Sequence, residues 1–156
     1  MLTNWEFEKK YFLHKDMVYR IAFTYMKNVQ ESEDILQEVF LKLYKREKGF
    51  ESEEHEKAWL IRVTINCSKN LLNSSFLRNT TEMNEDIIFE TKERHDIYYA
   101  VQELPVKYRT IIYLFYYEDY KISEISKILK INENTIKSRL SRAREKLKEK
   151  VEGGIE

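Results

Sequence analysis

The chain has 156 residues, enough for one ordinary domain or two small helical ones, and its apolar fraction of 42% is sufficient for a buried core. Its 27 basic and 27 acidic residues balance, so any attraction to nucleic acid has to come from charge concentrated in one segment. One proline and three glycines supply too little turn chemistry for a many-stranded β protein. The chain is therefore predicted to be all-helical.

Signals of export, membrane insertion and catalysis are missing from the sequence. No run approaches the roughly 18 consecutive apolar residues of a membrane span, and the start, MLTNWEFEKK, lacks a signal-peptide pattern, so a cytoplasmic location is predicted. The lone Cys67 is expected to be a core residue. The histidines are scattered, and neither a Gly-rich phosphate loop nor a Ser/His/Asp arrangement is legible. We therefore expect no metal site, no cofactor and no catalytic residue.

Two helices are predicted first along the chain. Apolar residues at helical spacing indicate one over 11–27, with Asn28 as its left-handed stop. Ser32 is expected to cap the second helix. The apolar stripe of this second helix comprises Ile35, Leu36, Val39, Phe40 and Leu43.

The outer surface of this second helix combines acids, an amide and one exposed apolar group. It is formed, at helical three- and four-residue steps, by Asp34, Gln37, Glu38 and Leu41. Such a mixture suits docking to another protein, because the charges orient the partner and the apolar atoms are desolvated. A plain solvated face explains the same pattern, so both interpretations stay open here.

A charged loop is predicted over 46–54, followed by a helix from about His55 to Asn73. Opposite the apolar side of that helix, amide and cationic groups surround one aromatic residue. This stripe comprises Trp59, Arg62, Asn66, Lys69, Asn70 and Asn73. Backbone charge and base stacking supply affinity for single-stranded or melting DNA, which such a stripe could provide. The alternative is a polar solvent face, with Trp59 in the core.

The predicted organisation is two small domains, 1–73 and 93–152, joined by a flexible linker over 74–92. The linker is rich in Asn, Ser, Thr and acids and follows no sustained period. In the second domain, Pro105 suits the first turn of the aromatic-rich helix VKYRTIIYLFYYE.

The second domain is predicted to end in two short amphipathic helices joined by the turn KIN. The first, ISEISKIL, places Ile122, Ile125 and Leu129 on one face. Asn132 can cap the second helix. The inward stripe of the second helix comprises Ile136, Leu140, Ala143 and Leu147. This is the frame of a helix-turn-helix, whose second member enters the DNA major groove.

The last helix also concentrates positive charge. Residues 132–150 hold seven cations against three acids, and the cations are Lys137, Arg139, Arg142, Arg144, Lys146, Lys148 and Lys150. The inward stripe turns Ser138, Ser141 and Arg142 outward, with Lys137 beside them. Arg142 could pair with a guanine, while Arg139 and Arg144 on the flanks suit phosphates. A solvated face with local ion pairs is the alternative.

Four segments in this order resemble the extracytoplasmic-function (ECF) sigma factors of bacterial RNA polymerase. They are DILQEVFLKLY (34–44), KAWLIRVTIN (57–66), ELPVKYRTIIYL (103–114) and SEISKILKINENTIKSRLSRAREKL (123–147), similar to sigma regions 2.2, 2.3 to 2.4, 4.1 and 4.2. The resemblance covers nearly the whole chain. It implies a region 2 helical bundle and a region 4 helix-turn-helix, with core RNA polymerase, promoter DNA and an anti-sigma factor as partners.

The resemblance also implies a role for each surface. Asp34, Gln37, Glu38 and Leu41 would meet the clamp helices of polymerase, and loop 46–54 would hold an extruded base of the minus-ten element. Trp59, Arg62, Asn66, Lys69 and Asn70 would contact the melting minus-ten strand. Lys137, Ser138, Arg139, Ser141, Arg142 and Arg144 would bind the minus-35 duplex. Rival hypotheses are a stand-alone helix-turn-helix regulator and a helical interaction protein whose basic helix docks an acidic partner.

Three positions depart from the family pattern. Asp119 and Lys130 stand where the family often has glycine, and Lys121 stands where a Ser or Thr cap is usual. The first two positions would require a non-glycine residue in the left-handed region of backbone space. Lys121 removes the side-chain acceptor that normally starts the helix.

Overall fold

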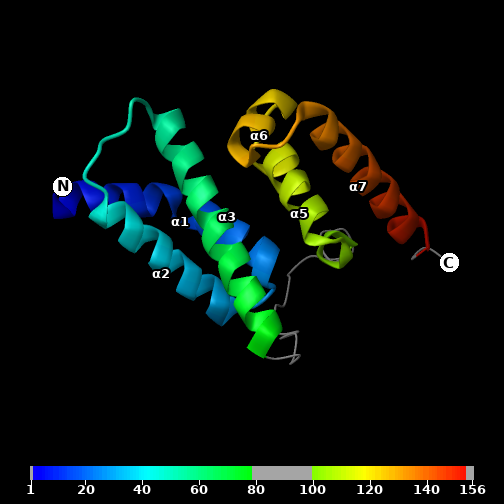
Figure 1. Cartoon of the computed structure of the whole chain (residues 1–156), viewed down its shortest axis with the longest axis horizontal. Helices are drawn as coiled ribbons and strands as arrows, with labels where there is room; N and C mark the ends of the chain where they lie inside the picture. Colours follow the sequence, from blue (N-terminus) through cyan, green and yellow to red (C-terminus); the bar gives the residue numbers. More distant parts are fainter. Residues whose placement is uncertain (1, 79–99, 154–156) are drawn as a thin grey trace. The chain divides into compact units, whose positions relative to one another are not determined.

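The computed structural model describes residues 2–78 and 100–153, and every regular element among them is a helix (Figure 1). The all-helical prediction is confirmed. The chain separates into two compact units, Met1–Met83 and Asn84–Glu156. One predicted domain falls in each unit. Most of the predicted linker over 74–92 lies outside the described residues, but its first five positions continue a helix that ends at Arg78.

Helix α1 (Asn4–Met26) begins earlier than the predicted 11–27 because the chain builds a capping box at its start. The Thr3 hydroxyl accepts from the Glu6 N–H at 3.1 Å, and the Glu6 carboxylate accepts from the Thr3 N–H at 2.9 Å. The Thr3 backbone bond, followed by the Thr3 hydroxyl, lowers the pKa of Glu6.

The link between α1 and α2 (Val29–Lys45) corrects two expectations. Lys27, not Asn28, is the left-handed stop, with φ of 54°. Asn28 is instead the cap of α2, because its short side chain reaches the Glu31 N–H at 2.9 Å. Ser32, predicted to be that cap, is buried inside the first turn and its hydroxyl donates to the Asn28 carbonyl. A connection of two residues leaves room for only one stop and one cap.

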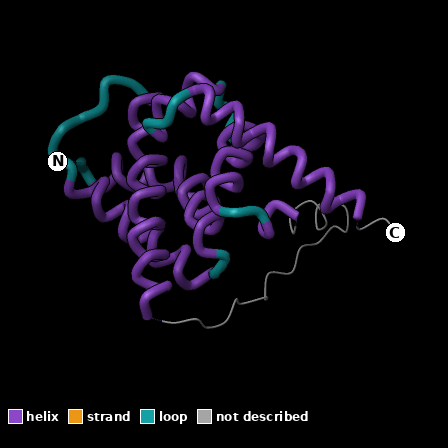
Figure 2. The backbone as a smooth tube through the Cα atoms, turned by 45° about the vertical axis from the view of Figure 1, so that its right-hand side comes forward, coloured by secondary structure: helices purple, strands orange, loops and turns teal. Residues whose placement is uncertain are grey.

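The core of the first unit lies where α3 (Glu53–Arg78) packs against both α1 and α2. Its fully buried side chains include Val18, Ile21, Ile35, Val39, Leu43, Leu60 and Ile61. Edge-to-face aromatic pairs also join α1 to α2. The ring centroid of Phe40 lies 6.3 Å from that of Phe7 and 4.9 Å from that of Tyr11. Figure 2 shows the loop that leads from α2 into α3.

The second unit begins, among the described residues, with a helical turn over 100–103, and Pro105 precedes α5 (Val106–Ile112). The predicted helix VKYRTIIYLFYYE does not stay α-helical. It widens into the π-helical turn η1 (Tyr113–Tyr117), where the Glu118 N–H donates to the Tyr113 carbonyl at 3.2 Å.

Helices α6 (Ile122–Leu129) and α7 (Glu133–Gly153) complete the second unit. The largest fully buried side chains here are Leu104, Ile111, Leu114, Ile125 and Ile136. On α6, Ile125 is buried as predicted, but Ile128 is buried more fully than the expected Leu129.

The two positions where the family often has glycine both adopt the left-handed conformation. Asp119, before α6, and Lys130, after it, each have φ of 56°. Lys121 takes the cap position without a side-chain bond to the helix, and Glu124 alone completes that start by accepting from the Lys121 N–H at 2.9 Å. Two left-handed positions that glycine would favour are therefore occupied here by residues that stabilise this conformation less well, and α6 begins without a side-chain cap.

Candidate nucleic-acid interface

The turn between α6 and α7 is held by hydrogen bonds on both sides. The Lys130 N–H donates to the Ser126 carbonyl, and the Ser126 hydroxyl donates to the Ile131 carbonyl. Asn132 caps α7 as predicted, because its side-chain oxygen accepts from the Asn134 N–H at 2.8 Å. These bonds fix the direction in which α7 leaves the turn.

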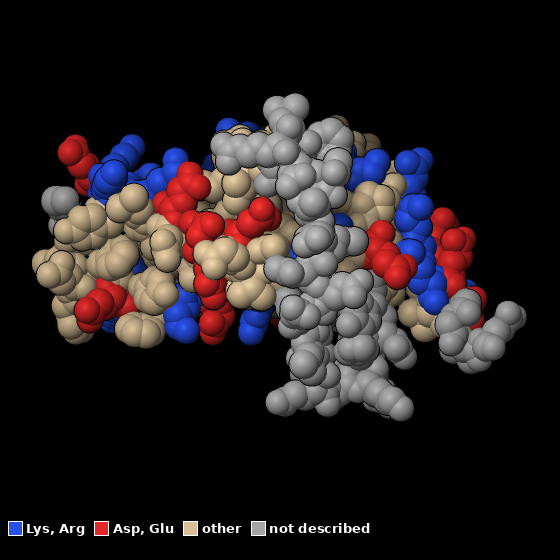
Figure 3. Space-filling view, turned by 90° about the horizontal axis from the view of Figure 1, so that it is seen from below, with Lys and Arg blue, Asp and Glu red and all other residues tan. Residues whose placement is uncertain are grey.

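Helix α7 presents one apolar and one polar face, as predicted. Ile136, Leu140 and Ala143 are buried against the rest of the second unit, whereas Leu147 is only half-buried. The opposite face carries exposed side chains, namely Lys137, Ser138, Ser141 and Arg142, while Arg139 on the flank is half-buried. Figure 3 shows Lys and Arg atoms in a band on the right-hand side, where Figure 1 draws α7, with acidic atoms beside them.

Arg144 differs from the other predicted minus-35 contacts because its side chain is bonded within its own unit. Its Nε donates to the Tyr116 hydroxyl at 2.7 Å, and its guanidinium lies 5.5 Å from the Phe115 ring centroid and 5.7 Å from that of Tyr116. Arg144 therefore ties α7 to η1. Sequence reasoning placed this arginine on a phosphate-facing flank and missed its aromatic partners, of which Tyr116 lies 28 positions away.

The polar stripe of α3 divides into an exposed part and a packed part. Asn66, Lys69 and Asn70 are exposed, whereas Arg62 and Trp59 are half-buried. The exposed amides and the lysine ammonium are available to bases and phosphates. The packed part continues into the loop before α3.

That loop folds back on α3 to form an aromatic cluster that sequence reasoning did not find. The Arg46 guanidinium lies 4.3 Å from the Phe50 ring centroid and 5.0 Å from that of Trp59. The Phe50 and Trp59 rings meet edge to face at 5.6 Å. The available signal was an aromatic residue, Phe50, inside an otherwise charged loop.

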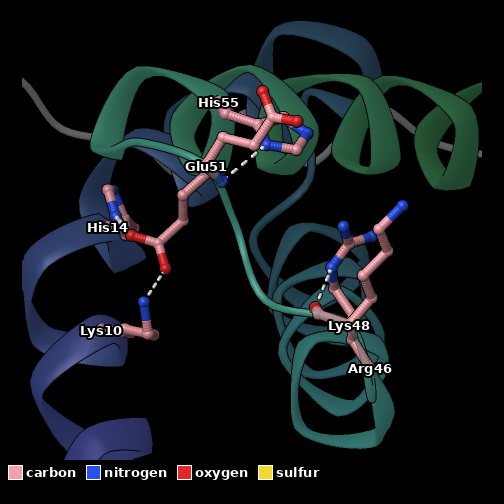
Figure 4. Close-up of polar contacts among 7 residues, drawn as sticks. Lys10, His14, Arg46, Lys48, Glu51 and His55 are labelled. Atoms are coloured by element: carbon pink, nitrogen blue, oxygen red, sulfur yellow. Dashed lines mark hydrogen bonds and ion pairs between the residues drawn. The ribbon is translucent and has the colours of Figure 1, made fainter.

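An open cavity of about 350 Å³ lies beside this cluster, lined by Arg46, Phe50, Lys10 and Glu56 among others. Glu56 is buried, and its carboxylate pairs with the Lys10 ammonium and with His14 Nε2, the latter at 3.1 Å. Figure 4 shows the Lys10 and His14 side chains directed toward one shared carboxylate. This triad joins α1 to the first turn of α3. It therefore anchors the start of α3, against which Phe50 packs.

The outer face of α2 is exposed as predicted. Leu41 keeps 51% of its surface in solvent, and Asp34 accepts from the Gln30 side chain at 3.2 Å. Gln37 and Glu38 are also exposed. Burial of Cys67 on α3, followed by the nearby Glu38 carboxylate, raises the pKa of the Cys67 thiol to about 11. Glu38 therefore reaches from α2 to α3. Cys67 is buried, as expected of a core residue.

Within residues 2–78 and 100–153, no three His, Cys, Asp or Glu side chains come together in a way that could hold a metal ion. No helix in the described part of the chain is long and apolar enough to cross a membrane.

Both units of the chain are similar to known protein families. Residues 11–75 match the Sigma-70 region 2 family and residues 94–147 match the Sigma-70 region 4 family. RNA polymerase sigma factor SigV of Bacillus subtilis is 34% identical over 135 residues, which cover 83% of this chain and 81% of that protein. ECF RNA polymerase sigma factor SigW of the same organism is 28% identical over 89% of this chain and 85% of that protein. The chain belongs to the ECF sigma factors.

Two solved structures share the fold of this sigma factor. The sigma factor RpoE of Bartonella quintana, in complex with the anti-sigma factor NepR, gives a TM-score of 0.76 at 22% identity and covers 94% of this chain and 96% of that one. CnrH, in complex with the cytosolic domain of CnrY, gives a TM-score of 0.71 at 18% identity, with 97% and 90% covered.

Proposed function

We propose that this sigma factor binds core RNA polymerase mainly through α2, reads the minus-35 element with α7 and captures the melting minus-ten strand with α3 and the loop before it. Three exposed and chemically different surfaces support this division. The corresponding domains are 1–73 and 93–152, with 74–92 as the connection between them.

The proposed minus-35 surface is supported by the exposure of polar α7 side chains around two small serines. Ser138 and Ser141 let the helix backbone approach the base edges, and Arg142 has the fork geometry that guanine O6 and N7 accept. Lys137 and Arg139 suit flanking phosphates. Arg144 has a smaller share in DNA contact, because its guanidinium is held by Phe115 and Tyr116.

The proposed minus-ten surface joins the exposed amides of α3 to the aromatic cluster. Asn66, Lys69, Asn70 and Arg62 are placed along one helix to follow a single strand. Trp59 has a second role, because it supports Phe50 and Arg46 at the edge of the cavity. An extruded base stacks on such rings once the duplex opens.

The proposed polymerase surface is the face of α2 that carries Asp34, Gln37, Glu38 and Leu41. An exposed leucine bordered by carboxylates and an amide provides apolar contact area and an orienting charge together. No part of this function requires a catalytic step by the chain itself, and its place of action is the cytoplasm, where polymerase meets the chromosome. An anti-sigma factor is the proposed regulator, as in the NepR complex of one structural neighbour.

A mobility-shift assay tests this function. The chain has balanced charge and one basic helix, so it offers few phosphate contacts alone. We expect promoter DNA to shift only when core polymerase is present, and Leu41→Ala combined with Gln37→Ala to lower that shift while Lys45→Ala, at the exposed end of α2, leaves it unchanged. An equal shift with and without core enzyme would instead identify a stand-alone helix-turn-helix regulator.

A further inference from the structure

Helix α1 carries an exposed apolar stripe that the surfaces described above do not use. Trp5, Phe12 and Leu13 keep 70%, 66% and 65% of their surface in solvent, more than any other large apolar side chain in the described residues apart from Tyr117, which equals Leu13 at 65%. At about 100° per residue they share one side of the helix with Lys9, Asp16 and Arg20, and these three side chains are exposed as well.

This stripe faces away from the core of the first unit. The opposite side of α1 buries His14, Met17, Val18 and Ile21 against α2 and α3. Three large apolar groups gathered on the solvent side of one helix mark a protein contact more often than chance exposure does. The order of residues along the stripe identifies the partner.

We propose that the α1 stripe binds the same stripe of a second copy of this chain, with the two helices antiparallel. A two-fold axis between Phe12 and Leu13 brings each of them onto the other in the partner copy. The same axis sets Lys9 against Asp16 and Trp5 against Arg20, so every charged or aromatic group meets a complementary one. A two-fold contact requires this self-complementarity, and an unrelated partner would not.

The contacts within each copy leave these groups able to pair across the axis. Among residues 2–78 and 100–153, the ion pair of Asp16 is with Lys15 at 3.6 Å, where the two side chains keep 71% and 38% of their surface in solvent. Solvent-accessible ion pairs of this kind exchange at little cost. Lys9 lies 5.4 Å from the Trp5 ring centroid, which leaves the other face of that indole for Arg20 of the second copy.

The stripe from Trp5 to Arg20 is roughly 22 Å long, and one helix pair of this length covers less than the roughly 800 Å² per partner of a standard interface. The dimer is accordingly weak, with a Kd of roughly 10–100 μM. It forms when the factor accumulates, and it does not depend on the proposed promoter or polymerase contacts.

Sedimentation velocity of the full chain from about 1 to about 300 μM tests the dimer. We expect the sedimentation coefficient to rise with concentration, and Phe12→Ala with Leu13→Ala to abolish that rise. Lys9→Glu or Asp16→Lys alone should weaken association about tenfold, because symmetry creates two like-charge pairs, and the double variant should restore it. Circular dichroism verifies that each variant is folded.

Leu41→Asp provides the matched control, an exposed leucine in the same unit. It should leave self-association intact while lowering binding to core polymerase, and Leu13→Asp should do the reverse. A wild-type chain that stays monomeric throughout the range overturns the proposal, as does a dimer that the double charge exchange fails to restore. Loss of polymerase binding in Leu13→Asp, with no self-association in the wild type, would assign the stripe to polymerase instead.

Discussion

The α7 face and the aromatic cluster before α3 both hold cations at a surface proposed to bind DNA, but they hold them in opposite ways. Arg142 on α7 projects into solvent, with no polar partner among the described residues. Arg46 is half-buried and stacked on Phe50 and Trp59. Duplex DNA presents its base edges in an open groove, so a reading side chain needs only to be extended from a rigid helix. A single strand needs a stacking surface, which an ordered aromatic cluster supplies.

Arg144 shows that charge alone does not predict which cation reads DNA. It lies two positions from Arg142 on the same helix, yet its Nε is bonded to Tyr116. The two DNA surfaces therefore differ in the partners of each cation rather than in the number of cations. The following variants test that difference.

The largest energetic effect is expected from Glu56→Ala, next to the aromatic cluster. Removing this buried carboxylate leaves Lys10 and His14 without their partner and should lower the unfolding free energy of the first unit by about 3 kcal/mol. Urea denaturation measures this loss. Glu54→Ala, exposed on the same helix, should change stability little. Equal stability of the two variants would show that the triad does not anchor α3.

Arg142→Ala should lower the preference for a promoter with an intact minus-35 element by about 2 kcal/mol, or roughly 30-fold. Competition between intact and substituted promoters for holoenzyme gives this ratio. Arg144→Ala serves as the control, because its aromatic contacts make it a positioning residue that should shift stability more than sequence preference. If the two variants lose preference equally, the distinction between extended and stacked arginines is wrong.

Arg46→Ala should destabilise the aromatic cluster by about 1 kcal/mol, the scale of one cation–π contact near the protein surface. In a Trp5→Phe background, the fluorescence of Trp59 reports this directly. We expect a red-shifted emission and faster acrylamide quenching, with Arg46→Lys intermediate because it keeps the charge but lacks the planar guanidinium. Unchanged emission would mean that Arg46 does not cover the indole.

The smallest effect is expected at Cys67. Because burial raises the pKa of its thiol to about 11, the folded chain should react slowly with a thiol-directed disulfide reagent at pH 8, and much faster once unfolded. The raised pKa favours the protonated thiol in the folded state. The contribution of this thiol to folding stability is therefore fully present below its unfolded-state pKa of 9.0, and it is lost as the pH rises through about 11. Rapid labelling of the native chain would contradict this burial.

Parts of the molecule that depend on local periodicity could be predicted from sequence. Most of the inward stripes of α2 and α7 is buried as expected, because an amphipathic pattern specifies its own buried face. Leu36 on α2 and Leu147 on α7 are the exceptions, since each is only half-buried. The family resemblance, carried by four ordered segments, is confirmed by the two Sigma-70 matches. The roles of individual DNA and polymerase contacts stay predictions.

The parts that could not be predicted depend on contacts between distant residues or on competition between near neighbours. Nothing local pairs Arg144 with Tyr116, 28 positions away, or folds Arg46 onto Trp59. Asn28 and Ser32 are both good caps, and only the two-residue connection after α1 decides between them.

Permanganate probing of holoenzyme on a promoter tests most directly whether α7 binds duplex DNA while the aromatic cluster binds the melted strand, because it measures promoter occupancy and melting separately. We expect Arg142→Ala to reduce occupancy, with normal melting restored at higher holoenzyme concentration. Phe50→Ala should leave occupancy unchanged and reduce the reactivity of thymines in the minus-ten element. If both variants change occupancy and melting in the same proportion, the two surfaces do not act on different forms of DNA.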